Sequence, residues 1–254
     1  MDNEKQIHSF EYDGDAYEGE ALDNVPHGYG KMTSPDGDVY EGNFLNGCFH
    51  GRGRLHRKDG QVLDGIWVGN ELIDSDAYAH VKSVDAGGNA VTLTDDAIIE
   101  IYCLYKKADE YMKKGKYAAE LGVLNHALRI VPDNPATLIK IGRCYRSLGL
   151  YDNAIETYKR AIEIAPTFGI AYFNLGLAYS LNEQWLEAIR QYNKALKLFD
   201  RSTYTYWMGY ANYGVMLAKL GDLDKGDAMI TEAERHGYKD AERCRIAAGI
   251  KTKK

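Results

Sequence analysis

The acidic pair Asp36 and Asp38 is the first place where side chains of this sequence could do chemistry, because neighbouring carboxylates can hold a calcium ion. The residues that follow lack the third acidic ligand and the distant glutamate of a calcium loop. The stretch itself, "DGDVYEGN" from Asp36 to Asn43, repeats "DGDAYEGE", which begins twenty-three residues earlier at Asp13. A repeated turn explains both carboxylates, so we interpret the pair as structural.

Histidines and cysteines are the other residues that could hold a metal or attack a substrate. His27 and His50 occupy equivalent positions of the repeat, which favours a structural role. The cysteines lie far apart, without a CxxC pair, as packed thiols of an intracellular protein do: Cys48, Cys103, Cys144 and Cys244. The sequence has no glycine-rich phosphate loop, nucleophile elbow or HExxH motif. We therefore predict that the protein is not an enzyme and uses no cofactor or metal.

Charge is unevenly distributed along the 254 residues, whose formal net charge is −6. Residues 1–96 hold 7 Lys+Arg against 19 Asp+Glu, whereas the remainder holds 24 against 18. The acidic first part should be repelled by nucleic acid and by anionic lipid, and the basic second part should attract acidic partners. The N-terminus lacks the features of a signal peptide, and no apolar run approaches membrane-spanning length. These observations predict a cytoplasmic protein that binds no nucleic acid and is unlikely to bind membranes.

A repeat of twenty-three residues organises the first part of the chain. It aligns glycines in columns, including Gly19, Gly42 and Gly65, with a large residue two positions before each of them. Asp-Gly between alternating segments is typical of a tight β-hairpin turn, since glycine tolerates positive φ. The recurring glycines mark places where a ring or a backbone approaches too closely for a Cβ atom. We expect hairpins whose core is made of aromatic rings stacked over glycines.

These motifs resemble the MORN repeat, in which "YxG" is followed by "GxG" on the same period, as in "YEGEALDNVPHGYG" and "YEGNFLNGCFHGRG". The resemblance covers residues 8–72 and weakens in the third copy, where Leu63 replaces the tyrosine. It implies an antiparallel β-hairpin sheet over residues 1–72. Residues 73–97 are predicted to form a connecting hairpin or linker, with "AHVKSV" and "AVTLT" as its strands.

A second period, of thirty-four residues, begins after Asp96 in amphipathic helical sequence, as the positions Tyr117, Tyr151 and Trp185 show. The segment "LIKIGRCYRSLGLYDNAIETYKRAIEIAP" resembles the tetratricopeptide (TPR) repeat almost position for position. The resemblance implies four helical hairpins over residues 98–237, followed by a capping helix and basic tail over residues 238–254. Four added residues precede the fourth hairpin, and they should lengthen its first helix by a turn. The fold class is therefore α+β, a MORN sheet followed by an α-helical TPR solenoid.

In TPR proteins the first helices of successive hairpins line a groove that holds a peptide, and the resemblance transfers this role to residues of the present chain. Phe173 and Leu177 have an alternative, which is to pack against the next helix. The lysines and asparagines of a chaperone-tail carboxylate clamp are not assembled in either register of the repeats. The partner-binding residues implied are Tyr102, Tyr105, Ile139, Arg143, Arg146, Phe173, Asn174 and Leu177.

Our leading hypothesis is a protein-protein interaction adaptor that captures a peptide with acidic flanks, selected by Arg143 and Arg146. The alternatives are lipid binding through the MORN half and a regulatory or targeting subunit of a separate enzyme. The free edges of the sheet also predict a homodimer formed through the first twelve residues. Among Tyr204, Tyr206 and Trp207, at least one ring should stand exposed as a peptide anchor, unless all three pack around Trp185 and Leu196.

Overall fold

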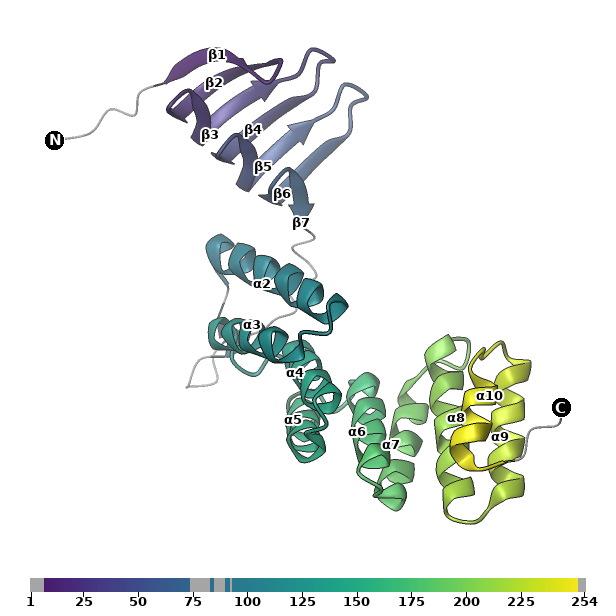
Figure 1. Ribbon diagram of the computed structural model, residues 1–254. Coiled ribbons are helices and arrows are strands. Elements are labelled where there is room, and N and C mark those ends of the chain that lie inside the picture. The colour runs from purple at the N-terminus through teal and green to yellow at the C-terminus, as the bar shows by residue number, and fades with distance from the viewer. Residues whose placement is uncertain (1–6, 74–82, 85–89, 92, 251–254) are drawn as a thin grey trace. The chain divides into compact units, whose positions relative to one another are not determined.

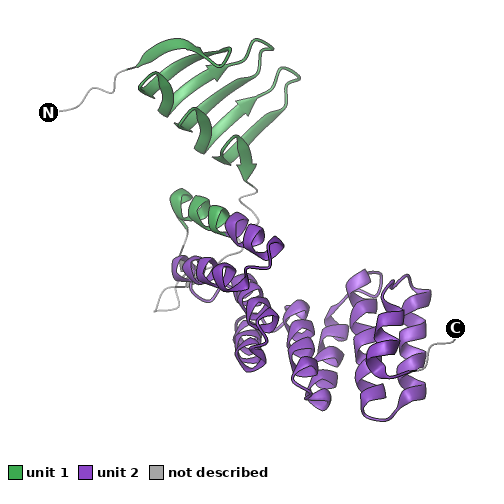
Figure 2. Ribbon diagram, in the orientation of Figure 1, with its two compact units in different colours: residues 1–104 green, residues 105–254 purple. Residues whose placement is uncertain are grey.

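The structure is a computed structural model that describes residues 7–73, 83–84, 90–91 and 93–250. Figure 1 shows a run of strands followed by a run of helices, as the sequence predicts for an α+β chain. The chain divides into two compact units, residues 1–104 and residues 105–254, which Figure 2 shows in different colours. Each unit is described by itself.

Unit 1 is built on an antiparallel sheet of seven strands in which each strand pairs with the next one along the chain. Because every connection is a short turn, the sheet is a meander with β1 at one edge and β7 at the other. The strands are β1 (His8–Tyr12), β2 (Asp15–Leu22), β3 (Val25–Thr33), β4 (Val39–Leu45), β5 (Cys48–His56), β6 (Val62–Val68) and β7 (Glu71–Ile73).

The turns of the sheet confirm part of the sequence-based assignment. Asp13 and Gly14 both have positive φ and join β1 to β2 as a two-residue turn, as the Asp-Gly pattern predicts. Gly37 and Gly60 also have positive φ, but they lie in longer loops. Further pairs of left-handed residues close the remaining hairpins: Asp23 with Asn24, Asn46 with Gly47, and Gly69 with Asn70. These Asx-containing turns were not singled out from the sequence.

One row of glycines crosses the sheet from β2 to β6. Neighbours in this glycine row are directly paired across every strand boundary: Gly19, Gly30, Gly42, Gly53 and Gly65. A Cβ atom on Gly30 would lie 2.6 Å from the ring carbon Cε2 of Tyr17, and one on Gly53 would lie 2.4 Å from Cζ of Tyr40. The tyrosine rings therefore lie directly over the row, and the expectation of aromatics stacked on glycines is confirmed.

The aromatic core of the sheet continues from these two tyrosines. Tyr40 stacks on Phe49 with the ring centroids 3.7 Å apart, and the Trp67 ring meets Tyr40 edge-on. Trp67 also donates a hydrogen bond from Nε1 to the Gly53 carbonyl at 2.9 Å, which fixes the indole over the glycine row. In the third repeat unit Trp67 is the buried aromatic ring, while Leu63 is only partly buried. This explains how a unit that lacks the tyrosine still closes the core.

The first part of helix α2 (Asp95–Lys113) packs on the last strands within unit 1. Ile66, Ile73 and Ile99 form a small buried cluster there. Arg52 donates hydrogen bonds to both carboxylate oxygens of Asp95, at 3.0 and 2.9 Å. Between the sheet and α2 along the chain, β8 (Ser83–Val84) and β9 (Ala90–Val91) pair as a two-stranded sheet. Of the rest of the predicted segment 73–97, Ile73 belongs to β7, Leu93 and Thr94 form no strand, and residues 95–97 belong to α2; the other residues lie outside the described ones.

Unit 2 is a stack of helical hairpins (Figure 1), in which small residues allow close helix crossings. A Cβ atom on Gly142 would lie 2.5 Å from the Tyr158 ring, and one on Gly176 would lie 2.9 Å from the Tyr192 ring. After α2 come α3 (Tyr117–Ile130), α4 (Pro135–Ser147), α5 (Tyr151–Ile164), α6 (Gly169–Leu181), α7 (Trp185–Leu198), α8 (Tyr204–Lys219), α9 (Leu223–Arg235) and α10 (Ala241–Ala248).

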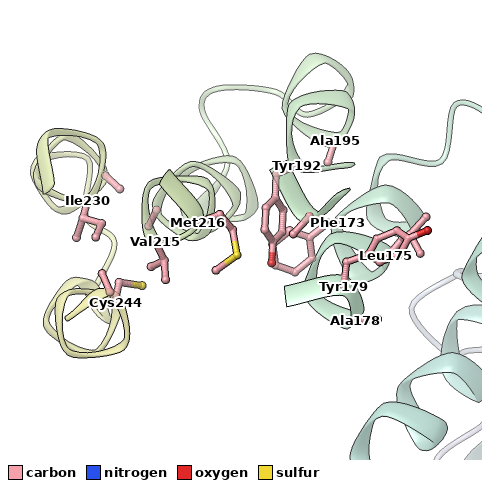
Figure 3. Close-up of a cluster of buried hydrophobic side chains, with 14 of the residues drawn as sticks. Phe173, Leu175, Ala178, Tyr179, Tyr192, Ala195, Val215, Met216, Ile230 and Cys244 are labelled. Atoms are coloured by element: carbon pink, nitrogen blue, oxygen red, sulfur yellow. The ribbon is translucent and has the colours of Figure 1, made fainter. Parts of the chain in front are cut away.

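The fourth hairpin confirms the insertion argument. Helix α8 has 16 residues, whereas α4 and α6 have 13 each, so the added residues lengthen the helix at its first turn. The core continues through this hairpin without a break, from Phe173 and Tyr192 to Met216, Ile230 and Cys244 (Figure 3). Helix α10 packs against α8 and α9, as expected of a cap.

Candidate functional site

The sequence-predicted binding residues of unit 2 belong to α2, α4 and α6, the first helices of three successive hairpins. We call them the first-helix set: Tyr105, Ile139, Arg143, Arg146, Phe173, Asn174 and Leu177. Apart from Phe173, all of them are only partly buried. Tyr102, the eighth predicted residue, lies in unit 1, where its hydroxyl donates to Oε2 of Glu71 at 2.6 Å. It packs there beside the isoleucine cluster.

Arg143 is held by a buried carboxylate. Its Nη2 atom donates to Oε1 of Glu120 on α3 at 2.5 Å, and the Glu120 side chain is fully buried while that of Arg143 is 31% exposed. Glu120 occupies the repeat position that Ala154 and Ala188 fill in the following hairpins. A buried carboxylate requires a cationic partner. The charge of Arg143 is therefore neutralised within the chain.

Lys140 and Tyr105 form a second polar contact between hairpins. The ammonium group of Lys140 lies 3.0 Å from Oδ1 of Asp109 and 5.5 Å from the centroid of the Tyr105 ring. The Tyr105 hydroxyl is hydrogen-bonded to the side chain of Thr137, and burial raises the pKa of this phenol. These contacts fix the Tyr105 ring against α4.

Arg146, one turn after Gly142 on α4, differs from Arg143. No carboxylate pairs with it among the described residues, whereas Glu120 pairs with Arg143; the Nε atom is buried without a hydrogen-bond partner in both arginines. The guanidinium lies near the hydroxyls of Tyr158 and Tyr192 and opposes the rise that burial causes in the pKa of both phenols. Arg146 is thus the cation of the first-helix set that the chain leaves available.

The apolar members of the set are placed differently from one another. Phe173 is only 5% exposed and packs against Tyr192 and Phe199, so it belongs to the core of unit 2. Phe173 and Tyr192 are labelled in Figure 3. This is the alternative that the sequence left open for this residue. Ile139 is partly buried against the same core, Leu177 is also partly buried, and Asn174 bonds to the carbonyl of Ile170 on its own helix.

The aromatic residues at the start of α8 do not all pack alike. Tyr206 is buried, whereas Tyr204 remains 49% exposed beside Tyr238. Trp207 stacks face to face on His236, with the ring centroids 3.8 Å apart and the planes at 4°. The alternative that all three rings pack on the preceding helix is wrong, because Tyr204 is exposed. The expectation that at least one ring stands exposed is confirmed, and its use as a peptide anchor stays a prediction.

Glu120, Tyr158 and Tyr192 were not assigned a role at this site from the sequence. The signal for Glu120 was present, since a glutamate at a position that is alanine in the next two repeats must find a partner when buried. Within the described ranges, His, Cys, Asp and Glu side chains nowhere gather in threes as a group that could hold a metal ion. None of the described helices is long and apolar enough to cross a membrane.

Comparison with protein families agrees with this geometry. The MORN repeat model matches residues 17–39 and 40–62. Two models of the tetratricopeptide repeat match residues 142–183 and 169–202, which span α4 to α7. The chain combines MORN repeats with TPR repeats. The matched TPR segment includes Arg143, Arg146 and the tyrosines beside them.

Individual relatives are similar to part of the chain. Small glutamine-rich tetratricopeptide repeat-containing protein 2 of Mycosarcoma maydis is 26% identical over 53% of this chain and 38% of its own length. Tetratricopeptide repeat protein 6 of Homo sapiens is 28% identical over 46% of this chain and 22% of its own. The chain thus spans well under half the length of these relatives.

A solved structure supports the helical part of the fold. A mutant form of the O-GlcNAc transferase of Thermobaculum terrenum superposes with a TM-score of 0.51 and 24% identity, over 56% of this chain and 27% of that one. The likeness concerns the fold alone.

Proposed function

We propose that this protein is a non-enzymatic adaptor or scaffold whose TPR hairpins capture a peptide segment of a partner protein. The observation that carries the proposal is the match of residues 142–202 to the TPR repeat, in a segment that folds as stacked helical hairpins. A stack of this kind presents a row of first helices to an extended or helical peptide. The MORN and TPR arrays between them occupy most of the chain, which supports a binding role for both.

The first-helix set supports a preference for peptides that combine apolar and acidic residues. Ile139 and Leu177 supply partly buried aliphatic surface, and Tyr105 supplies a ring held in place by Thr137. The acidic preference rests on Arg146, because the charge of Arg143 is already neutralised by Glu120. A peptide with an apolar centre and an acidic flank is therefore the partner chemistry that we propose.

A display library of random peptides, panned on the full chain, tests this function. Asn174→Trp should reduce recovery of the selected peptides at least tenfold, because a large ring on α6 occupies space that the peptide needs. The matched control is Asn193→Trp, which places the same ring on an exposed position of α7, the second helix of that hairpin. Equal recovery by both variants, or no selection by the unmodified chain, would remove the proposal.

The MORN sheet is proposed as a second interaction surface. One exposed row carries charges that alternate in sign from strand to strand: Glu18, Lys31, Glu41, Arg54 and Asp64. Tyr29 stands 52% exposed beside this row and donates to Glu41 at 3.0 Å. A surface that mixes both signs with an exposed ring suits a protein partner better than a uniformly charged one.

Lipid binding through the MORN half receives less support. Of the four cations that could contact phosphate head groups, three are already paired, Arg52 with Asp95, Arg54 with Asp64 and Lys58 with Asp36. The fourth, Arg57, donates to the neutral side chain of Gln61. Head-group binding would need to release the three paired cations. Sedimentation with anionic vesicles at low salt distinguishes lipid binding from protein binding by the MORN half, since pelleting of the full chain would favour lipid binding. A regulatory subunit of an enzyme is a special case of the adaptor, and affinity purification with mass spectrometry would name its partner.

A further inference from the structure

Two tyrosine hydroxyls in the core of unit 2 have no hydrogen-bond partner among the described residues. Tyr158 on α5 and Tyr192 on α7 are both fully buried, and neither hydroxyl makes a hydrogen bond of acceptable geometry, although the Arg146 guanidinium lies close enough to the Tyr158 hydroxyl to oppose, as a donor, the rise in its pKa. A buried polar group that lacks a partner is costly, and native structures hold few of them. Each of these two hydroxyls therefore requires an explanation.

Arg146 lies near these two tyrosines. The Tyr158 ring packs under Gly142, and Arg146 follows Gly142 by one helical turn, so both residues lie on one stripe of α4. Burial raises the pKa of Tyr158 to about 12, and the nearby charge of Arg146 acts in the opposite direction. Burial also raises the pKa of Tyr192, and the charge of the Arg146 guanidinium opposes that rise. Both phenols therefore keep their protons at neutral pH and can donate them.

The cluster has an excess of donors. Arg146 has no carboxylate partner among the described residues, although the neighbouring Arg143 has one in Glu120. Two phenol protons and one guanidinium, from α4, α5 and α7, thus lack an acceptor among the described residues. The Oε2 atom of Glu120 is also buried without a partner, but it belongs to the carboxylate that Arg143 already holds. The missing partner must offer several lone pairs and one negative charge.

We propose that Arg146, Tyr158 and Tyr192 form a binding site for one carboxylate group of a captured peptide. The inference rests on the proposed function, because a peptide has to bring the carboxylate into the hairpin stack. A carboxylate matches the donors in number and geometry, since its two oxygens accept a forked bond from guanidinium and a hydrogen bond from each hydroxyl. A phosphate would bring a second negative charge, and the second cation near Tyr158, Arg143, is already paired with Glu120. The carboxylate can come from an acidic side chain or from a C-terminus.

Two isomeric probes distinguish these sources. N-acetylglutamate α-amide carries its carboxylate on the side chain, and N-acetylglutamine carries it on the main chain. The neutral N-acetylglutamine α-amide and inorganic phosphate complete the series. Binding to the full chain is followed by saturation-transfer NMR at millimolar concentration. We expect one of the two carboxylate isomers to bind at least about tenfold more tightly than the neutral amide, as for a charge-assisted hydrogen bond.

Three variants locate the binding. Arg146→Gln should abolish it, and Tyr158→Phe and Tyr192→Phe should each weaken it several-fold. Arg129→Gln, which removes an exposed arginine from α3, is the matched control and should bind like the unmodified chain. Because the hydroxyls lack partners in the free chain, both phenylalanine variants should melt no lower than the unmodified chain.

Several outcomes would overturn the proposal. They are equal binding of the neutral amide, preference for phosphate, unchanged binding by Arg146→Gln, or no binding at all. A lower melting temperature in both phenylalanine variants would also overturn it, because the hydroxyls would then be satisfied inside the free chain. Panning of the peptide display library distinguishes failure of the carboxylate site from failure of the proposed adaptor function. Peptides that are captured without an acidic preference would leave the adaptor standing and remove only the carboxylate site.

Discussion

At the scale of single residues, the helix crossings of unit 2 depend on a missing Cβ atom. Gly142→Ala should destabilise the full chain by about 1–3 kcal/mol, because the added methyl group would meet the Tyr158 ring at 2.5 Å. Gly122→Ala is the control, since no atom lies within 4 Å of that position in α3, and it should stabilise by up to about 1 kcal/mol. Urea denaturation followed by helical circular dichroism measures both. Two effects of the same sign would contradict the packing argument.

The pair of Glu120 and Arg143 should act as one unit. Arg143→Leu leaves a buried carboxylate without its partner and should cost about 2–3 kcal/mol, below the range of fully buried pairs because Arg143 is 31% exposed. Glu120→Ala together with Arg143→Leu should recover most of that loss, since alanine is the residue that the next two hairpins carry here. A double-mutant cycle measures the coupling. Additive losses would show that the two side chains act independently.

The cysteines should differ sharply in reactivity. Burial, with Glu120 nearby, raises the pKa of Cys144 to about 12, so its thiol stays protonated and unreactive at pH 8. Cys244 is also buried, and its pKa is raised for the same main reason, whereas Cys103 is exposed. Iodoacetamide at pH 8 should label Cys103 in the native chain and the two buried cysteines only in urea, as peptide mass spectrometry would show. Native labelling of Cys144 would place it outside the core.

At the scale of elements, the start of α8 separates packing rings from an exposed one. Tyr206→Ala and Trp207→Ala should each lower the free energy of unfolding by about 3–5 kcal/mol, because the first ring is buried and the second stacks on His236. Tyr204→Ala should cost less than about 1 kcal/mol, since half of its side chain is exposed. Thermal denaturation of the three variants checks the order. A large loss from Tyr204→Ala would make that ring structural as well.

The strands and helices could be predicted because their characteristic residues recur at the same positions in several copies of each repeat. Glycine and tyrosine columns reveal which positions touch within a repeat, as Gly30 under Tyr17 shows. Contacts between repeats left no such trace. Glu120 with Arg143 and Asp109 with Lys140 join different hairpins, and their partners follow from the angle at which the hairpins stack. The residues of the site could therefore be predicted as a surface. Their ion pairs, which among the described residues leave Arg146 without a carboxylate, required the structure.

At the scale of the whole molecule, the edge strand β1 should allow self-association. It pairs on one side only, and its five residues offer more free backbone than the three residues of β7 at the opposite edge. Light scattering of the full chain should show a mass rising toward the dimer with concentration. Removing residues 1–12 should restore the monomer, because the new edge strand β2 carries acidic side chains and an irregular register after Gly19. A mass that does not change with concentration would exclude the dimer.

The ion pair between Glu120 and Arg143 also bears on how an array of similar hairpins keeps its order while folding. Chains built from near-identical units are prone to join the wrong neighbours. A hairpin that carries Glu120 can bury it at low cost only against a hairpin that carries an arginine at the matching position, and α4 provides that arginine. The next two hairpins have alanine in place of the glutamate and the fourth has Gly226, so they lack this requirement. The pair therefore favours the correct order of the hairpins, because it distinguishes the first hairpin from the others and specifies the hairpin that packs against it.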